Sequence, residues 1–118
     1  MNNIEIENKY FLISKKYENI LKCPIECNFG WIDIIEQACH HINDYVTRTQ
    51  FENFKIVQIK EKFGQLRIYT STTDNYITGI IVMACAISNL TCEVCGSKGS
   101  CRSDKPWIRT LCDECNES

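Results

Sequence analysis

Two Cys-x-x-Cys pairs near the carboxyl end constrain the fold of this chain more than any other feature of its sequence. Cys92 and Cys95 form the first pair, Cys112 and Cys115 form the second, and 16 residues lie between the pairs. This spacing is typical of structural zinc sites with four cysteine ligands. Because four thiolates fill every position of a tetrahedral ion, we expect a structural zinc with no open position for water or substrate. Gly96 permits the tight turn that the first pair needs.

Other interpretations of the two pairs stay open. Iron, alone or in an iron-sulfur cluster, uses the same ligands, and the spacing does not exclude it. A redox-active pair of the thioredoxin type needs no second pair, so the sequence disfavours it. A disulfide framework is disfavoured because the nine cysteines are an odd number and the first ten residues lack the pattern of a secretory signal. We therefore expect a cytoplasmic protein.

The remaining cysteines carry a weaker signal. Cys101 lies between the two pairs and is expected to be a free thiol in a loop, with metal binding as the alternative. Cys23 and Cys27 are expected to be buried, although Cys39 or His40 could complete a second metal site with them. The sequence does not decide whether Cys23, Cys27 or Cys101 binds a second metal or is redox-active.

The chain of 118 residues fits one structural unit, in which residues 1–90 form an α+β body and residues 91–118 form a zinc knuckle or ribbon packed on it. Apolar residues at intervals of three and four predict a helix within residues 4–21 and a second helix over residues 31–46. Pro24 predicts a loop over residues 23–30 that joins them.

An antiparallel β-hairpin is predicted within residues 54–72. Val57 and Ile59 are expected to share one face of the first strand, and Leu66 and Ile68 one face of the second. Gly64 supplies the residue that a tight turn between the strands needs.

A third helix is predicted from Asn75 to about Leu90, with Asp74 or a neighbouring threonine as the N-cap. A strand is the alternative, because Gly79 and a β-branched run lie in this segment. The segment is apolar nearly all round and too short to span a bilayer, which takes about 20 residues. We therefore expect an interface here, with a protein partner or a second copy of the chain. The candidate interface residues are Ile77, Ile80, Ile81, Met83 and Ile87.

Three basic residues of the hairpin, Lys60, Lys62 and Arg67, form a candidate contact patch for a partner or a phosphate group. Solubility and protection of the sheet edge are the structural explanation for the same residues. The net charge of the whole chain is −2, so bulk charge does not favour nucleic acid. Nucleic acid is therefore a secondary expectation.

The order of these motifs resembles a group of small, mostly uncharacterised bacterial and phage-borne proteins. The motifs are Gly30-Trp31, QIKEKFGQLRIY at residues 58–69, TCEVCG at residues 91–96 and W-x-R-T-L-C at residues 107–112. The resemblance covers roughly residues 27–115 and implies a cytosolic accessory protein with a zinc knuckle and no established activity. Members of the group usually carry charged residues along the penultimate helix, where this chain has Ile80, Ile81, Val82, Met83 and Ala84.

The leading functional prediction is a non-catalytic protein-binding module, encoded by a phage or mobile element and acting in the host cytoplasm as an inhibitor or adaptor of a host defence complex. The first alternative is a zinc protein that binds nucleic acid through the hairpin patch with Arg102, Arg109 and Trp107. The second is a small hydrolase that uses Glu61 or Asp33 with His41, although no spacing in the chain directs two such groups to one substrate.

Overall fold

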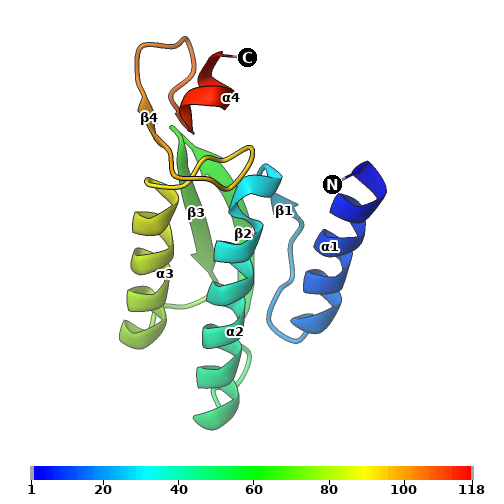
Figure 1. Ribbon diagram of the computed structural model, residues 1–118. Coiled ribbons are helices and arrows are strands. Elements are labelled where there is room, and N and C mark those ends of the chain that lie inside the picture. The colour runs from blue at the N-terminus through cyan, green and yellow to red at the C-terminus, as the bar shows by residue number, and fades with distance from the viewer. Residues whose placement is uncertain (1, 118) are drawn as a thin grey trace.

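The computed structural model describes residues 2–117 and has the predicted α+β architecture (Figure 1). A three-stranded sheet and three helices form the body, and a two-stranded hairpin with a short helix forms the carboxyl-terminal knuckle. The elements are α1 (Asn3–Lys16), β1 (Ile25–Glu26), the 3-10 helix η1 (Phe29–Trp31), α2 (Ile32–Arg48), β2 (Ile56–Lys62), β3 (Gln65–Thr70), α3 (Asn75–Ser88), β4 (Ser100–Arg102), β5 (Arg109–Leu111) and α4 (Asp113–Glu117).

The sheet has one strand more than the sequence predicts. Its order is β1-β2-β3, in which β2 and β3 form the expected antiparallel hairpin and β1 pairs in parallel with β2. The prediction of a loop over residues 23–30 was therefore wrong at Ile25–Glu26, which lie beside Ile59 and Lys60. Pro24 precedes this strand and is tolerated because β1 lies at the sheet edge.

The hairpin turn consists of Phe63 and Gly64, with φ angles of 54° and 76°. Two residues with positive φ match the right-handed twist of the flanking strands, which confirms the predicted role of Gly64. One detail of the prediction was wrong. A register shift between Ile56 and Gln58 leaves Val57 47% exposed, so the buried partner of Ile59 on the core side is Ile56.

The core lies between α2 and the inner face of the sheet. Most of the apolar side of α2 is buried, with Ile34 and Tyr45 only partly so, and the inward side chains of β2 and β3 pack against the same core. Fully buried members include Ile35, Ile42, Ile56, Ile59 and Leu66. α1 lies beside α2, where Lys9 pairs with Asp33 at 3.2 Å and Ile13 enters the core (Figure 1).

The third predicted segment is a helix, which excludes the alternative of a strand. Of the predicted N-cap candidates, Asp74 is the one that caps α3, because its Oδ1 accepts hydrogen bonds from the backbone N–H groups of Tyr76 and Ile77 at 2.9 and 3.1 Å. At the other end, the Oγ of Ser88 accepts from the backbone N–H of Leu66 at 3.1 Å. This buried hydrogen bond fixes α3 along β3. None of the helices within residues 2–117 has the length and apolar character needed to cross a membrane.

Candidate metal centre

The four cysteines of the two pairs meet at one point, as the sequence predicts. The Sγ atoms of Cys92, Cys95, Cys112 and Cys115 all lie within 4.8 Å of one another. The Sγ atoms of Cys95 and Cys112 are 3.6 Å apart. Sulfurs bound at about 2.3 Å around a tetrahedral ion are about 3.8 Å apart, so this cluster has the dimensions of a four-sulfur metal site. The cluster can hold a metal ion.

Two turns bring the sulfurs together. In the first turn, the N–H of Gly96 donates to the carbonyl of Cys92 at 3.0 Å, and the φ of Gly96 is 84°. In the second turn, which opens α4, the N–H of Cys115 points at the Sγ of Cys112 at 3.4 Å. The β4–β5 hairpin joins the two turns. Backbone N–H groups that point at sulfur are the usual outer shell of a thiolate metal site.

Hydrogen bonds in and around the cluster lower the pKa values of some of its thiols and raise that of another. Hydrogen bonds from Ser97, first from its side chain and then from its backbone, lower the pKa of Cys95 to about 6. The side-chain hydrogen bond with Cys112 raises the pKa of Cys115 to about 12. Burial acts to raise the pKa of Cys92, but hydrogen bonds from backbone N–H groups, that of Cys112 first, outweigh it and lower the pKa. Four adjacent thiols ionise together only around a cation, which a bound metal ion supplies.

The other cysteines stay outside this cluster. Cys101 is exposed, in agreement with a free thiol, although it lies on β4 instead of in a loop. Cys23 and Cys27 are half-buried, and Cys39 is fully buried. Burial raises the pKa of Cys27 and of Cys39 to about 12, which makes these thiols poor ligands and poor nucleophiles. Residues 2–117 contain no second group of side chains close enough to share an ion.

The first cysteine turn docks directly on the start of α2. The N–H of Gly30 donates to the carbonyl of Glu93 at 2.9 Å, and the indole Nε1–H of Trp31 donates to the carbonyl of Thr91 at 2.9 Å. Trp31 is 0% exposed. A Cβ atom on Gly30 would lie 2.2 Å from the carbonyl oxygen of Cys92. Glycine is therefore required at position 30 because the two backbones touch there.

The knuckle also docks on the hairpin turn of the body. The hydroxyl of Thr110 donates to the carbonyl of Gly64 at 2.6 Å. The carboxylate of Glu93, which is buried, accepts from Arg109 Nε at 2.7 Å and from the N–H of Thr110 at 3.3 Å. Both carboxylate oxygens are thus satisfied, which a buried charge requires.

Sequence reasoning missed the role of this junction. Gly30-Trp31 and the Phe-Gly turn are visible in the sequence only as parts of motifs, and no pattern assigns a role to Glu93 or Thr110. A signal was present, because these residues lie inside the same short motifs as the cysteines and the turn glycine. In the structure they connect the metal centre to the body.

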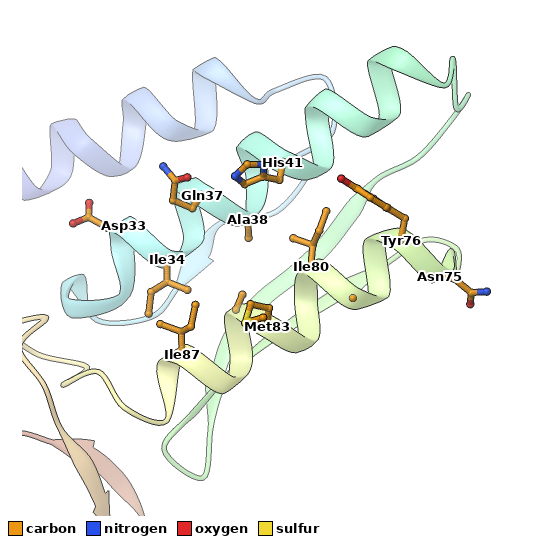
Figure 2. Close-up of a pocket in the computed structure, with 12 residues that line it drawn as sticks. Asp33, Ile34, Gln37, Ala38, His41, Asn75, Tyr76, Ile80, Met83 and Ile87 are labelled. Atoms are coloured by element: carbon orange, nitrogen blue, oxygen red, sulfur yellow. The ribbon is translucent and has the colours of Figure 1, made fainter.

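A groove of about 790 Å³ separates α2 from α3 (Figure 2). We call it the α2–α3 groove; its apolar walls are formed by Ile34, Ala38, Ile80, Met83, Ala84 and Ile87. Three of the predicted interface residues therefore line one surface. The prediction was wrong for Ile77, which is 1% exposed because the buried side of α3 places it in the core. Ile81 is half-buried against the core and lies outside the groove lining.

The predicted basic patch lies on the outer face of the sheet. β2 and β3 place Lys60 directly opposite Arg67 and Lys62 opposite Gln65. Because side chains alternate along a strand, the three basic residues face away from the core that Ile59 enters. We call Lys60, Lys62 and Arg67 the basic sheet face. The Nε of Arg67 is buried and has no hydrogen-bond partner within residues 2–117.

The residues of the hydrolase hypothesis do not converge. Asp33 and His41 both lie on α2 and line the α2–α3 groove. They are eight residues apart, which corresponds to about 12 Å along a helix and exceeds hydrogen-bonding reach. Glu61 lines a different cleft, with Asn28 and Glu93.

The docking contact predicts different effects for the two tryptophans of the chain. Trp31→Phe removes the indole N–H, so the carbonyl of Thr91 loses this hydrogen-bond donor. We therefore expect the free energy of unfolding to fall by about 1–3 kcal/mol. The cluster cysteines should also react faster with a thiol reagent. Trp107→Phe is the control, because Trp107 is 75% exposed. Equal stability and equal thiol reactivity in the two variants would contradict the docking role of Trp31.

Comparison with protein-family models, with curated proteins and with solved structures finds no significant match to this chain. The resemblance to phage-borne proteins therefore stays a prediction. The features that bear on function are the metal centre, the α2–α3 groove and the basic sheet face.

Proposed function

We propose that the four-cysteine cluster binds zinc and that the ion is structural. Four thiolates are a soft ligand set, and a tetrahedral arrangement of sulfurs suits zinc or iron. All four ligands of a tetrahedral ion come from the protein, so the proposal leaves no position for substrate. Zinc has no redox chemistry, which suits a centre whose turns are fixed by backbone contacts with the body.

Metal removal tests this proposal. Elemental analysis of the purified protein should give one zinc ion per chain, and a strong chelator should lower the melting temperature sharply, because a structural zinc contributes on the order of 10 kcal/mol to a small domain. Cys112→Ser should lose the ion, whereas Cys101→Ser, at an exposed thiol outside the cluster, should retain it. Iron in the purified protein, or a melting curve that a chelator leaves unchanged, would contradict the proposal.

We infer that the protein is a non-catalytic protein-interaction module. The observation that carries this inference is the α2–α3 groove, whose apolar walls stay open along α3. Met83 in its wall is 62% exposed, and Ile87 and Tyr76 are also exposed. A contiguous apolar surface of this kind on a small protein typically marks a binding site for another protein. The zinc knuckle then acts as a support, since it fixes the start of α2, which forms one wall.

The narrower prediction is that the partner is a host defence complex and that the module inhibits or adapts it. The support is the closed four-cysteine site and the surplus apolar surface on α3, while the resemblance to phage-borne proteins supplies only the suggestion that the partner belongs to a host. If the partner is a host defence complex, a lysate of host cells should contain it.

Affinity capture with matched variants tests the interaction function. The wild-type protein should retain a specific partner, and Met83→Glu should release it because a charge then enters the apolar wall. Val82→Glu is the control, since Val82 is 61% exposed but lies outside the groove lining. Binding that survives Met83→Glu, or that both variants abolish, would contradict the assignment of the groove.

A second candidate function is favoured by the basic sheet face. Lys60 and Arg67 lie on paired positions of neighbouring strands, and Lys62 lies two residues along the same face. Tyr69 is exposed on this face and offers a ring on which a base can stack. Basic and aromatic side chains on an open sheet suit the backbone and bases of a single-stranded nucleic acid.

Salt-dependent binding of a labelled single-stranded oligonucleotide tests this candidate. Affinity measured by fluorescence anisotropy should fall as salt rises, and Lys60→Gln with Lys62→Gln should reduce the slope by about 0.7 per lost phosphate contact. Lys98→Gln, on the exposed surface of the knuckle, should leave the slope unchanged. Absence of binding at low ionic strength would rule this function out.

A further inference from the structure

We propose that a second copy of this chain covers the α2–α3 groove, so that two α3 helices pack face to face around a two-fold axis near Met83. This inference rests on the proposed function, because it takes the groove as a protein-binding surface and names the partner. Three independent features of the described residues support it: the spacing of the apolar side chains on α3, the distribution of charge around the groove, and Gly79.

Four large apolar residues of α3 that line the groove, and Leu90 beyond them, follow the spacing of a helix–helix seam, whereas the exposed Val82 lies outside it. Tyr76, Ile80, Met83, Ile87 and Leu90 are separated by four, three, four and three residues, and Leu90 lies just after the end of α3. An alternation of four and three places side chains in one stripe that interlocks with a matching helix. Within the chain, this stripe lies beside the buried side of α3, which Ile77, Ala84 and Ser88 form.

The charges around the groove suit a copy of the same surface. No residue of α3 carries a charge, so a second α3 meets neither repulsion nor an unpaired charge on this wall. On the α2 wall, Asp33, Gln37 and His41 form the rim at intervals of four residues (Figure 2). The rim therefore has a carboxylate at one end, an amide in the middle and an imidazole at the other end.

A two-fold axis through the middle of this rim makes it complementary to itself. In an isologous interface, each contact between two different residues occurs twice. Asp33 would then meet the second copy's His41, whose N–H can donate to the carboxylate, and Gln37 would meet its own counterpart. Lys9 already pairs with Asp33 at 3.2 Å, but the Asp33 side chain remains 82% exposed and can accept a further hydrogen bond. Met83 lies between Ile80 and Ile87 and is therefore placed near the axis.

Gly79 has no explanation within the single chain. It lies inside α3 and lines the groove, and a Cβ atom placed on it would meet nothing within 4 Å among the described residues. Glycine inside a helix costs about 0.5–1 kcal/mol relative to alanine. Packing against a second helix would explain a glycine at position 79, because the absence of a side chain lets two helix backbones approach each other.

Light scattering coupled to size exclusion tests the inference across a concentration series. The wild-type protein should have twice the monomer mass, and Met83→Glu should weaken self-association by at least about a hundredfold, because two carboxylates would meet near the axis. Met83→Lys should do the same. Val82→Glu, at an equally exposed position outside the groove, should stay dimeric. Circular dichroism checks that every variant is folded, as the exposure of Met83 leads us to expect.

Mixing the two Met83 variants distinguishes a second copy from any other occupant. A mixture of Met83→Glu with Met83→Lys should recover the dimer mass, since opposite charges then meet near the axis. A monomeric wild-type protein, a dimer that persists in both Met83 variants, or no recovery on mixing would overturn the inference. A monomer that binds a different protein through Met83 would overturn it while leaving the proposed interaction function intact. A wild-type protein that neither self-associates nor captures a partner would remove both proposals.

Discussion

The contact between the backbone of Gly30 and the backbone of the first cysteine turn is the constraint on which the rest of the structure depends. It joins the beginning of α2 to the metal centre at a distance that no side chain at position 30 would permit. Beside this contact, the indole of Trp31 donates a hydrogen bond to the carbonyl of Thr91. At the hairpin turn, the hydroxyl of Thr110 donates a hydrogen bond to the carbonyl of Gly64. The metal centre is therefore packed directly against the body of the protein. The folded knuckle and the folded start of α2 stabilise each other.

This coupling relates the metal centre to the surfaces on which the proposed functions rest. α2 begins directly after the docked tryptophan and supplies one wall of the α2–α3 groove, and α3 ends four residues before Cys92. The basic sheet face occupies the outer side of the hairpin whose turn holds Thr110. Under the proposal of a structural zinc, an ion at this point would stabilise both surfaces without entering either of them. A chain of this size has a small core, so such an ion would contribute a large share of its stability.

Local patterns in the sequence predicted most of the fold and the cluster of four cysteines. Helices α2 and α3, the Asp74 cap and the Phe-Gly turn depend on residues close together in the chain, and periodicity or turn chemistry reveals them. The cluster of four cysteines could also be predicted, because two short turns with a fixed spacing define it. The α+β class followed from these elements.

What the sequence could not predict depends on contacts between distant segments. Parallel pairing of Ile25–Glu26 with β2, the register shift that exposes Val57, and the burial of Ile77 are decided by neighbours far along the chain. From the sequence, Glu93 would be predicted to lie on the surface as an acidic side chain. Its burial is explained by the hydrogen bonds that it accepts from Arg109 and Thr110.

X-ray absorption spectroscopy of the purified protein at the zinc edge tests the central claim most directly, because it reports the ligands of the ion in solution. We expect four sulfur neighbours at about 2.3 Å and no nitrogen or oxygen ligand. A spectrum with a light-atom ligand in place of one sulfur, or a folded protein that contains no metal at all, would contradict the account of a closed structural centre formed by Cys92, Cys95, Cys112 and Cys115.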